Sequence, residues 1–223
     1  WKRVGLPKKN KFVYLENSYH GETIGALSVT DIPIFRKQYA SLIKPYFSVP
    51  SPDLRLNKAN KTSEEFIQEK IKSLKILFEK KHEVISSIIL EPLVQCATGM
   101  GIYDSIYLKK VRELCDTYEV HLIVDEIAVG FGRTGKMFAH QYAKIIPDFI
   151  CLSKGLTGGY LPLSVTLTTD EVYSAFYSDK MADAFLHSHS YTGNPLACSA
   201  ALGTLSIFEK EDVLKNNKIK SNL

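Results

Sequence analysis

Residues 84–90 read VISSIIL, residues 120–126 read VHLIVDE, and residues 149–152 read FICL. Each stretch contains a short, mostly apolar run, which is typical of a strand buried on both faces of a sheet. Residues 163–168, which read LSVTLT, favour a fourth strand. The spacing between these runs leaves room for a helix after each of the first two, as in a parallel sheet with crossover connections.

Capping residues mark the start of two helices, one before the strand at residues 84–90 and one after it. Thr62 and Glu65 form a capping box ahead of residues 66–78, where apolar residues recur on one helical face. Asp104 can cap a second helix. The apolar residues expected on that second helix are Ile106, Leu108, Val111, Leu114 and Cys115.

Two further helices complete the expected fold. A short helix is predicted over residues 137–143 and a longer one from Asn194 to Glu209, whereas the proline-rich residues 49–53 indicate a rigid surface loop. Strands that alternate with helices predict an α/β fold, in which a mostly parallel sheet is flanked by helices.

The composition excludes several classes of protein. The 223 residues are 45% hydrophobic and 23% charged with a net charge of +4, as in a soluble globular protein. Acidic residues interrupt the lysines of residues 70–81, so we expect a solvated helix face there and no nucleic-acid partner. No run approaches the roughly 18 apolar residues of a membrane span. Four cysteines without metal-ligand spacing favour a reducing compartment, the cytoplasm; they are Cys96, Cys115, Cys151 and Cys198.

Ionisable residues follow three of the predicted strands. Glu91 comes after the first strand, Asp125 and Glu126 after the second, and Lys154 after the third. Ligands of parallel α/β sheets bind outside the carboxyl ends of the strands. Because a buried charge is costly unless it is paired, three strands that each deliver an ionisable residue to one edge favour a functional site over ordinary loop residues.

Lys154 is the most informative of these residues. It lies on a turn of small residues, between Ser153 and Gly155, where an amine can approach a cofactor closely. A desolvated lysine loses its proton more readily and attacks a carbonyl, of which the aldehyde of pyridoxal 5'-phosphate (PLP) is a common example. A carboxylate such as Asp125 would keep the ring nitrogen of that cofactor protonated.

Two other kinds of site are less consistent with the sequence. Residues 130–136, GFGRTGK, match most of a nucleotide-binding P-loop, but Met137 stands where a Ser or Thr would bind magnesium. The loop also follows the acidic strand instead of preceding it. His187 and His189 flank Ser188, but no third ligand has a recognisable spacing, so we expect no metal.

Five motifs together support a resemblance. They are residues 16–23 (ENSYHGET), 90–95 (LEPLVQ), 125–135 (DEIAVGFGRTG), 152–159 (LSKGLTGG) and 191–198 (YTGNPLAC). The chain, from about residue 11 to 208, resembles the class III, or ω-type, PLP-dependent aminotransferases of fold type I. Ala128, where many members have Gln, and the run of residues 156–169 are similar to the members that act in biotin biosynthesis.

The resemblance implies roles for several residues around the cofactor. Lys154 would bond to the PLP aldehyde and afterwards carry the substrate proton, and Asp125 would pair with the ring nitrogen. Tyr19 would stack on the ring and contact the substrate. Glu91 would organise the polar side of the cofactor, and Gly159 would lie at the substrate.

A homodimer with the site at its interface is also implied by the resemblance. Ser190 and Tyr191 would reach the cofactor phosphate of the neighbouring subunit, although His189-Ser190 replaces a Pro–Thr pair here. Arg133 would lie at the entrance of the site or in a structural ion pair.

The reaction implied is transamination of 8-amino-7-oxononanoate to 7,8-diaminononanoate, with S-adenosylmethionine or, as in some relatives, lysine as amino donor.

Members of the class are longer than this chain. Residues 1–208 are therefore expected to be part of a PLP-binding large domain truncated at both ends, and residues 209–223 the start of the connection to a small domain. The missing flanks normally supply a phosphate cradle and a carboxylate-binding arginine, so we expect little activity from this chain alone. Two alternatives are another class III ω-amino acid or diamine aminotransferase, and a non-catalytic remnant.

Overall fold

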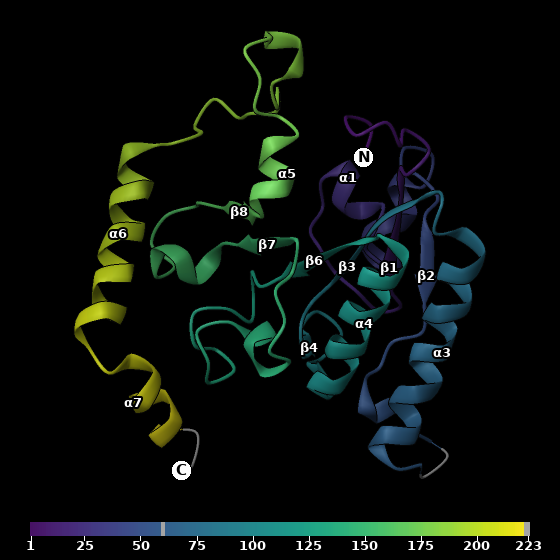
Figure 1. Ribbon diagram of the computed structural model, residues 1–223. Helices are drawn as coiled ribbons and strands as arrows, with labels where there is room; N and C mark the ends of the chain where they lie inside the picture. Colours follow the sequence, from purple (N-terminus) through teal and green to yellow (C-terminus); the bar gives the residue numbers. More distant parts are fainter. Residues whose placement is uncertain (59–60, 221–223) are drawn as a thin grey trace.

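The computed structural model describes residues 1–58 and 61–220 (Figure 1). Within them, a six-stranded sheet has the order β2-β1-β3-β6-β7-β8, in which only β8 is antiparallel to its neighbour. Its strands are β1 (Lys11–Leu15), β2 (Phe47–Val49), β3 (Ile85–Leu90), β6 (His121–Asp125), β7 (Phe149–Leu152) and β8 (Val165–Thr168). A small antiparallel pair consists of β4 (Val94–Gln95) and β5 (Gly101–Ile102).

Helices lie beside the sheet and beyond its β8 end (Figure 1). The α-helices are α1 (Ile24–Leu27), α2 (Pro33–Arg36), α3 (Ser63–Lys81), α4 (Ser105–Tyr118), α5 (Asp170–Ser174), α6 (Pro195–Lys210) and α7 (Val213–Lys220). The 3-10 turns are η1 (Lys37–Tyr39), η2 (Leu54–Leu56), η3 (Ala139–Tyr142), η4 (Lys154–Thr157) and η5 (Met181–Asp183).

The main core lies between the sheet and the neighbouring helices α3 and α4. Ile67, Ile71, Leu74 and Phe78 of α3 are buried in one cluster with strand residues such as Ile88. Full burial of an aliphatic or aromatic side chain contributes about 1.5–3 kcal/mol. This face therefore fixes the β1–β3–β6 part of the sheet.

The structure confirms the predicted strands and capped helices. Thr62 and Glu65 form the capping box of α3, and the Asp104 carboxylate accepts a hydrogen bond from the backbone N–H of Ile106 at the start of α4. Asn194 caps α6 in the same way, through the N–H groups of Leu196 and Ala197. The α/β fold with a mostly parallel sheet is thus confirmed.

Three local predictions are wrong. Ile106 is 40% exposed, and Tyr107, which is fully buried, takes its place in the core of α4. Residues 137–143 contain only the short 3-10 turn η3. The N–H groups of Ala139 and His140 at its start bond to the Glu126 side chain instead of beginning a longer helix. Residues 51–53 are buried instead of lying on the surface.

The sequence pattern also missed strands β1 and β2. β1 begins with the charged Lys11, and β2 has only three residues. Both pair in parallel with neighbours that are distant in the sequence. None of the described helices combines the length and hydropathy that crossing a membrane requires.

Asp148 connects β6, α4 and the segment before β7. Its carboxylate accepts hydrogen bonds from the backbone N–H of Leu122 and from Arg112, each at 2.6 Å. Burial opposes its charge, but these bonds and His121 outweigh that effect and lower the pKa of Asp148 to about 2. The charged form is therefore favoured by folding.

We expect Asp148→Asn to lower the free energy of unfolding by about 1–2 kcal/mol at neutral pH. Because the pKa is lower in the folded state, the contribution of Asp148 is present above pH 4 and is lost as the pH falls towards 2. Urea unfolding at several pH values measures this difference. Asp116→Asn is the control, since Asp116 pairs with the same Arg112 but is exposed, and should change stability by less than about 0.5 kcal/mol.

Candidate active site

The register of the sheet brings the predicted strand-end residues to one edge. Leu90 of β3 pairs with Val124 of β6, and Asp125 pairs with Cys151 of β7. Glu91 therefore emerges beside Asp125, and Lys154 follows the next strand. Glu91 and Asp125 are buried, with 5% and 6% exposure, whereas Lys154 is exposed.

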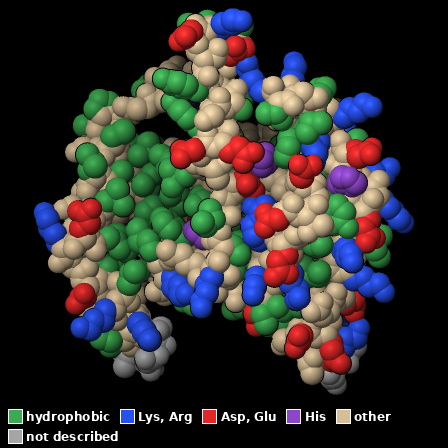
Figure 2. All heavy atoms as spheres, in the orientation of Figure 1, with side chains coloured by type: hydrophobic (Ala, Val, Ile, Leu, Met, Phe, Trp, Pro, Cys, Tyr) green, Lys and Arg blue, Asp and Glu red, His purple; other side chains and the backbone are tan. Residues whose placement is uncertain are grey.

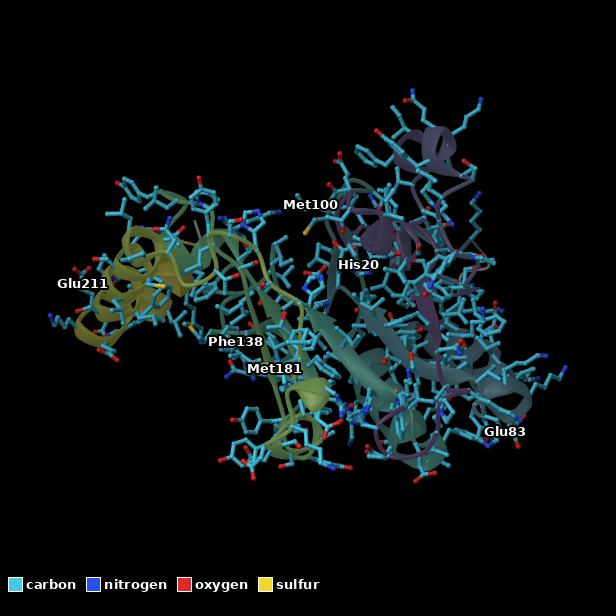
Figure 3. The ribbon with its side chains drawn as sticks, turned by 90° about the horizontal axis from the view of Figure 1, so that it is seen from above. His20, Glu83, Met100, Phe138, Met181 and Glu211 are labelled. Carbon is cyan, nitrogen blue, oxygen red and sulfur yellow. The ribbon has the colours of Figure 1, made fainter. Side chains whose placement is uncertain are left out.

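Asp125 is held by a histidine to which the sequence analysis assigned no role. The Asp125 Oδ2 atom lies 2.8 Å from Nδ1 of His20, and Oδ1 accepts a hydrogen bond from the backbone N–H of Ile127. Nε2 of His20 is buried without a hydrogen-bond partner among the described residues. His20 lies near the centre of the molecule in Figure 3. The only sequence feature that could have indicated a role for His20 was its position next to Tyr19 in the 16–23 motif.

Glu91 fixes the segment that carries Tyr19. Its carboxylate accepts hydrogen bonds from the backbone N–H of Tyr19 at 3.2 Å and of Cys96 at 3.0 Å. Burial raises the pKa of Glu91, an effect that the nearby His20 opposes and Asp125 reinforces. Glu91 thus connects the Tyr19 segment and the β4–β5 hairpin to the end of β3.

Tyr19 is half-buried beside this carboxylate pair. Its phenol donates a hydrogen bond to Oε1 of Glu22 at 2.9 Å, and its ring lies 5.2 Å from the ring of Phe35. Burial, followed by the contact with Glu22, raises the pKa of Tyr19. The phenol therefore stays protonated at neutral pH and presents an apolar ring face.

Lys154 lines a pocket of about 530 Å³ together with Ala128, Phe131, Arg133 and Gly155. Its φ of 45° is in the left-handed region, which is unfavourable for a residue with a side chain and occurs most often at functional sites. We expected a desolvated lysine from the sequence. Within residues 1–58 and 61–220, however, no segment covers Lys154, which is exposed.

Gly155 permits close packing next to Lys154. A Cβ atom at this position would lie 2.8 Å from Cβ of Phe131 and 2.9 Å from its Cδ2. The small-residue turn predicted from the sequence is therefore required by Phe131, which packs directly on the backbone that carries the lysine.

Other predicted site residues do not line this pocket. Tyr191 lines a second pocket of about 670 Å³ with Ser153 and Asn194, and both Ser190 and Tyr191 are exposed. Gly159 is exposed with open space around it, and its backbone N–H donates a hydrogen bond to the carbonyl of Lys154. Their contacts with cofactor or substrate stay predictions.

Comparison with known proteins points to one enzyme class. The family described as "Aminotransferase class-III" matches residues 1–223. Adenosylmethionine-8-amino-7-oxononanoate aminotransferase of Helicobacter pylori is 50% identical over 215 residues, which are 96% of this chain and 47% of that enzyme.

Solved structures agree with this result. The enzyme of the same name from Methanocaldococcus jannaschii superposes with a TM-score of 0.85 at 38% identity, over 96% of this chain and 47% of that one. An amine transaminase from an uncultivated Pseudomonas species, in a PLP-bound form, superposes with a TM-score of 0.90 at 32% identity, over 97% of this chain and 49% of that one. The chain spans about half the length of the relatives it matches.

We expect Gly155→Ala to lower the free energy of unfolding by about 1–3 kcal/mol, because the added methyl group overlaps Phe131. Thermal unfolding measures the loss. Gly25→Ala in α1 is the matched control, since a Cβ atom there has no neighbour within 4 Å. Equal stability of the two variants would contradict the packing role of Gly155.

Proposed function

The chain belongs to the class III aminotransferases, and we propose that the protein containing it converts 8-amino-7-oxononanoate to 7,8-diaminononanoate by transamination. The proposed amino donor is S-adenosylmethionine, and the pathway is biotin biosynthesis. The relatives with this name support the substrate. The observation that carries the chemistry is the buried, histidine-bound Asp125 on the strand next to β7, which ends two residues before Lys154.

The residues at the sheet edge fit PLP, the cofactor of this class. When bound, its conjugated ring supplies an electron sink for the charge left when a C–H bond beside the reacting nitrogen breaks. Lys154 offers an amine on a pocket wall, Asp125 offers a buried carboxylate, and Tyr19 offers an aromatic face. This donor set matches an aldehyde, a protonated ring nitrogen and a flat ring.

Each of these side chains has a distinct task in the proposed reaction. With PLP bound, the amine of Lys154 would hold the cofactor through its aldehyde and would afterwards move a proton at the substrate carbon. Asp125 would hold a proton at the ring nitrogen, and the contacts with His20 and Ile127 keep its carboxylate in place. Glu91 positions the backbone of Tyr19 so that its ring can cover the cofactor.

Arg133 offers a further guanidinium for the carboxylate of the acceptor, beside the arginine that the resemblance places outside residues 1–223. It is exposed, lines the same pocket as Lys154, and makes no ion pair with the described residues. Of the two expectations for Arg133, the structure therefore favours the site entrance over a structural ion pair. A free guanidinium binds a carboxylate through two parallel hydrogen bonds.

We also infer that two copies of the protein associate through the face beside α6. Hydrophobic side chains gather over this face in Figure 2. Two exposed apolar residues, Leu161 and Leu196, lie together there and line one pocket with Tyr191. An exposed apolar surface of this kind marks an interaction site. Tyr191 lies next to these two leucines and Ser190 precedes it in the chain, which supports the proposal that this segment reaches the cofactor phosphate of the neighbouring subunit.

The cellular setting is proposed from the cysteines. All four are free thiols in the structure, and Cys115 is fully buried. Free buried thiols are compatible with a reducing compartment, which supports the cytoplasm.

A second candidate is an aminotransferase for ω-amino acids or other amines. The amine transaminase superposes with the higher TM-score, 0.90 against 0.85, although its identity is lower. A panel of donors and acceptors, tested on the full-length protein, distinguishes the two substrates. A third candidate, a non-catalytic remnant, predicts no turnover with any pair.

We expect Lys154→Ala in the full-length protein to abolish both the visible absorbance of lysine-bound PLP and transaminase activity. Lys144→Ala is the matched control, because Lys144 is also an exposed lysine with a left-handed φ, of 54°. Absorbance titration with PLP measures the first effect. A Lys154→Ala protein that keeps the absorbance band would exclude the proposed role, and the 223-residue chain alone should show little or no turnover.

We expect Arg133→Gln to raise the KM for the keto-acid acceptor by about tenfold or more, with a smaller effect on the donor half-reaction, because the lost bond is to the acceptor carboxylate. Steady-state kinetics of the full-length protein measure both values. Lys136→Gln is the control from the same loop, since Lys136 already donates a hydrogen bond to the carbonyl of Gln141. Equal KM values for the two variants would contradict the proposal.

A further inference from the structure

Glu126 is a buried carboxylate that the proposed reaction does not use. It is fully buried directly after Asp125. Its side chain accepts hydrogen bonds from the backbone N–H groups of Ala139 and His140, at 2.9 and 2.8 Å, and lies 2.9 Å from Nδ1 of His140. A buried carboxylate is tolerated only when such donors satisfy it.

These bonds close residues 127–138 into a loop whose two ends meet at Glu126. At the first end, the carbonyl of Glu126 accepts a hydrogen bond from the N–H of Gly130, and its own N–H donates to the carbonyl of Cys151 in β7. At the second end, the carboxylate holds Ala139 and His140. The loop is thus tied directly to the strand that leads to Lys154.

The closed loop forms one wall of the Lys154 pocket. Ala128, Phe131 and Arg133 line that pocket with Lys154. The position of the guanidinium relative to the lysine amine therefore depends on how this loop is held.

A series of ring contacts connects His140 with the Lys154 backbone. The ring of His140 stacks on Phe138 at 5.9 Å, and Phe138 meets Phe131 edge-on at 5.8 Å. Phe131 in turn packs against Gly155. Phe138, labelled in Figure 3, lies between the helical arm near Glu211 and the centre of the molecule.

We propose that Glu126 and His140 form a clasp that positions Arg133 and Phe131 against Lys154, so that both are positioning residues for binding of the acceptor carboxylate. This inference rests on the proposed function. It separates the tasks of two successive carboxylates: Asp125 serves the cofactor, and Glu126 serves the wall of the substrate pocket.

The central test compares two substitutions of His140 in the full-length protein. In His140→Asn, the side-chain amide nitrogen occupies the same place in the chain of bonds as Nδ1 and can still donate to Glu126. His140→Leu removes the donor and replaces the ring with an apolar side chain of similar bulk. Glu126→Gln provides a third variant, which removes the charge of the acceptor.

Hydrogen exchange of the amides in residues 127–140 measures the clasp without any substrate. We expect His140→Leu and Glu126→Gln to speed this exchange by about tenfold or more, since bonds to a charged acceptor are the stronger ones, while His140→Asn stays near the parent. Exchange in α3 and α4 should be unchanged. Unchanged exchange of the loop in His140→Leu, or an equal rise throughout the protein, would overturn the clasp.

Kinetics and absorbance test the consequence for the substrate. We expect His140→Leu to raise the KM for the keto-acid acceptor by about tenfold, whereas the visible absorbance of lysine-bound PLP is kept and His140→Asn restores the KM. If His140→Leu lost the PLP absorbance as well as raising the KM, the Glu126–His140 pair would serve the cofactor, and the proposal would be overturned. If the parent protein transaminates no acceptor, the proposed function fails, and the exchange result still decides whether the clasp exists.

Discussion

The site depends on the register of three parallel strands. β6 pairs with β3 on one side and with β7 on the other, so the residues that follow the apolar runs emerge at the same edge. A slip of one residue would exchange the two faces of β6 and move the buried Leu122 and Val124 out of the core, in favour of the half-buried His121 and Ile123. Without this constraint, Glu91, Asp125 and Lys154 would not follow strands that end at the same edge.

Burial of two successive carboxylates gives this edge its internal order. Asp125 meets His20 from the N-terminal segment, and Glu126 meets His140 from η3. Successive side chains of an extended segment point to opposite faces, so one short stretch of chain supplies two environments. Because each carboxylate needs donors, the segment that provides them is held in place. The need of each buried carboxylate for hydrogen-bond donors thus orders the segments on both the proposed cofactor side and the proposed substrate side of the site.

Regular patterns made most of the fold predictable. The runs at β3, β6 and β7 were recognisable because they are short and mostly apolar, although β7 is largely half-buried, and the capping residues marked α3 and α4. β1 and β2 were missed because their stability comes from distant partners rather than from their own short sequences. Residues 51–53 were misplaced for a similar reason, since the pattern of prolines indicates a loop but not what covers it.

The chemistry of the site divides in the same way. The sequence by itself determined which ionisable residues follow the strands, and hence that Asp125 and Lys154 share an edge, because the period of a strand and the direction of a parallel sheet are local properties. Only the tertiary structure decided the partners of these residues. His20 contacts Asp125, which is 105 positions away in the sequence, and His140 contacts Glu126, which is 14 positions away. No local pattern encodes such pairs, because they follow from the way separate segments pack around a buried charge.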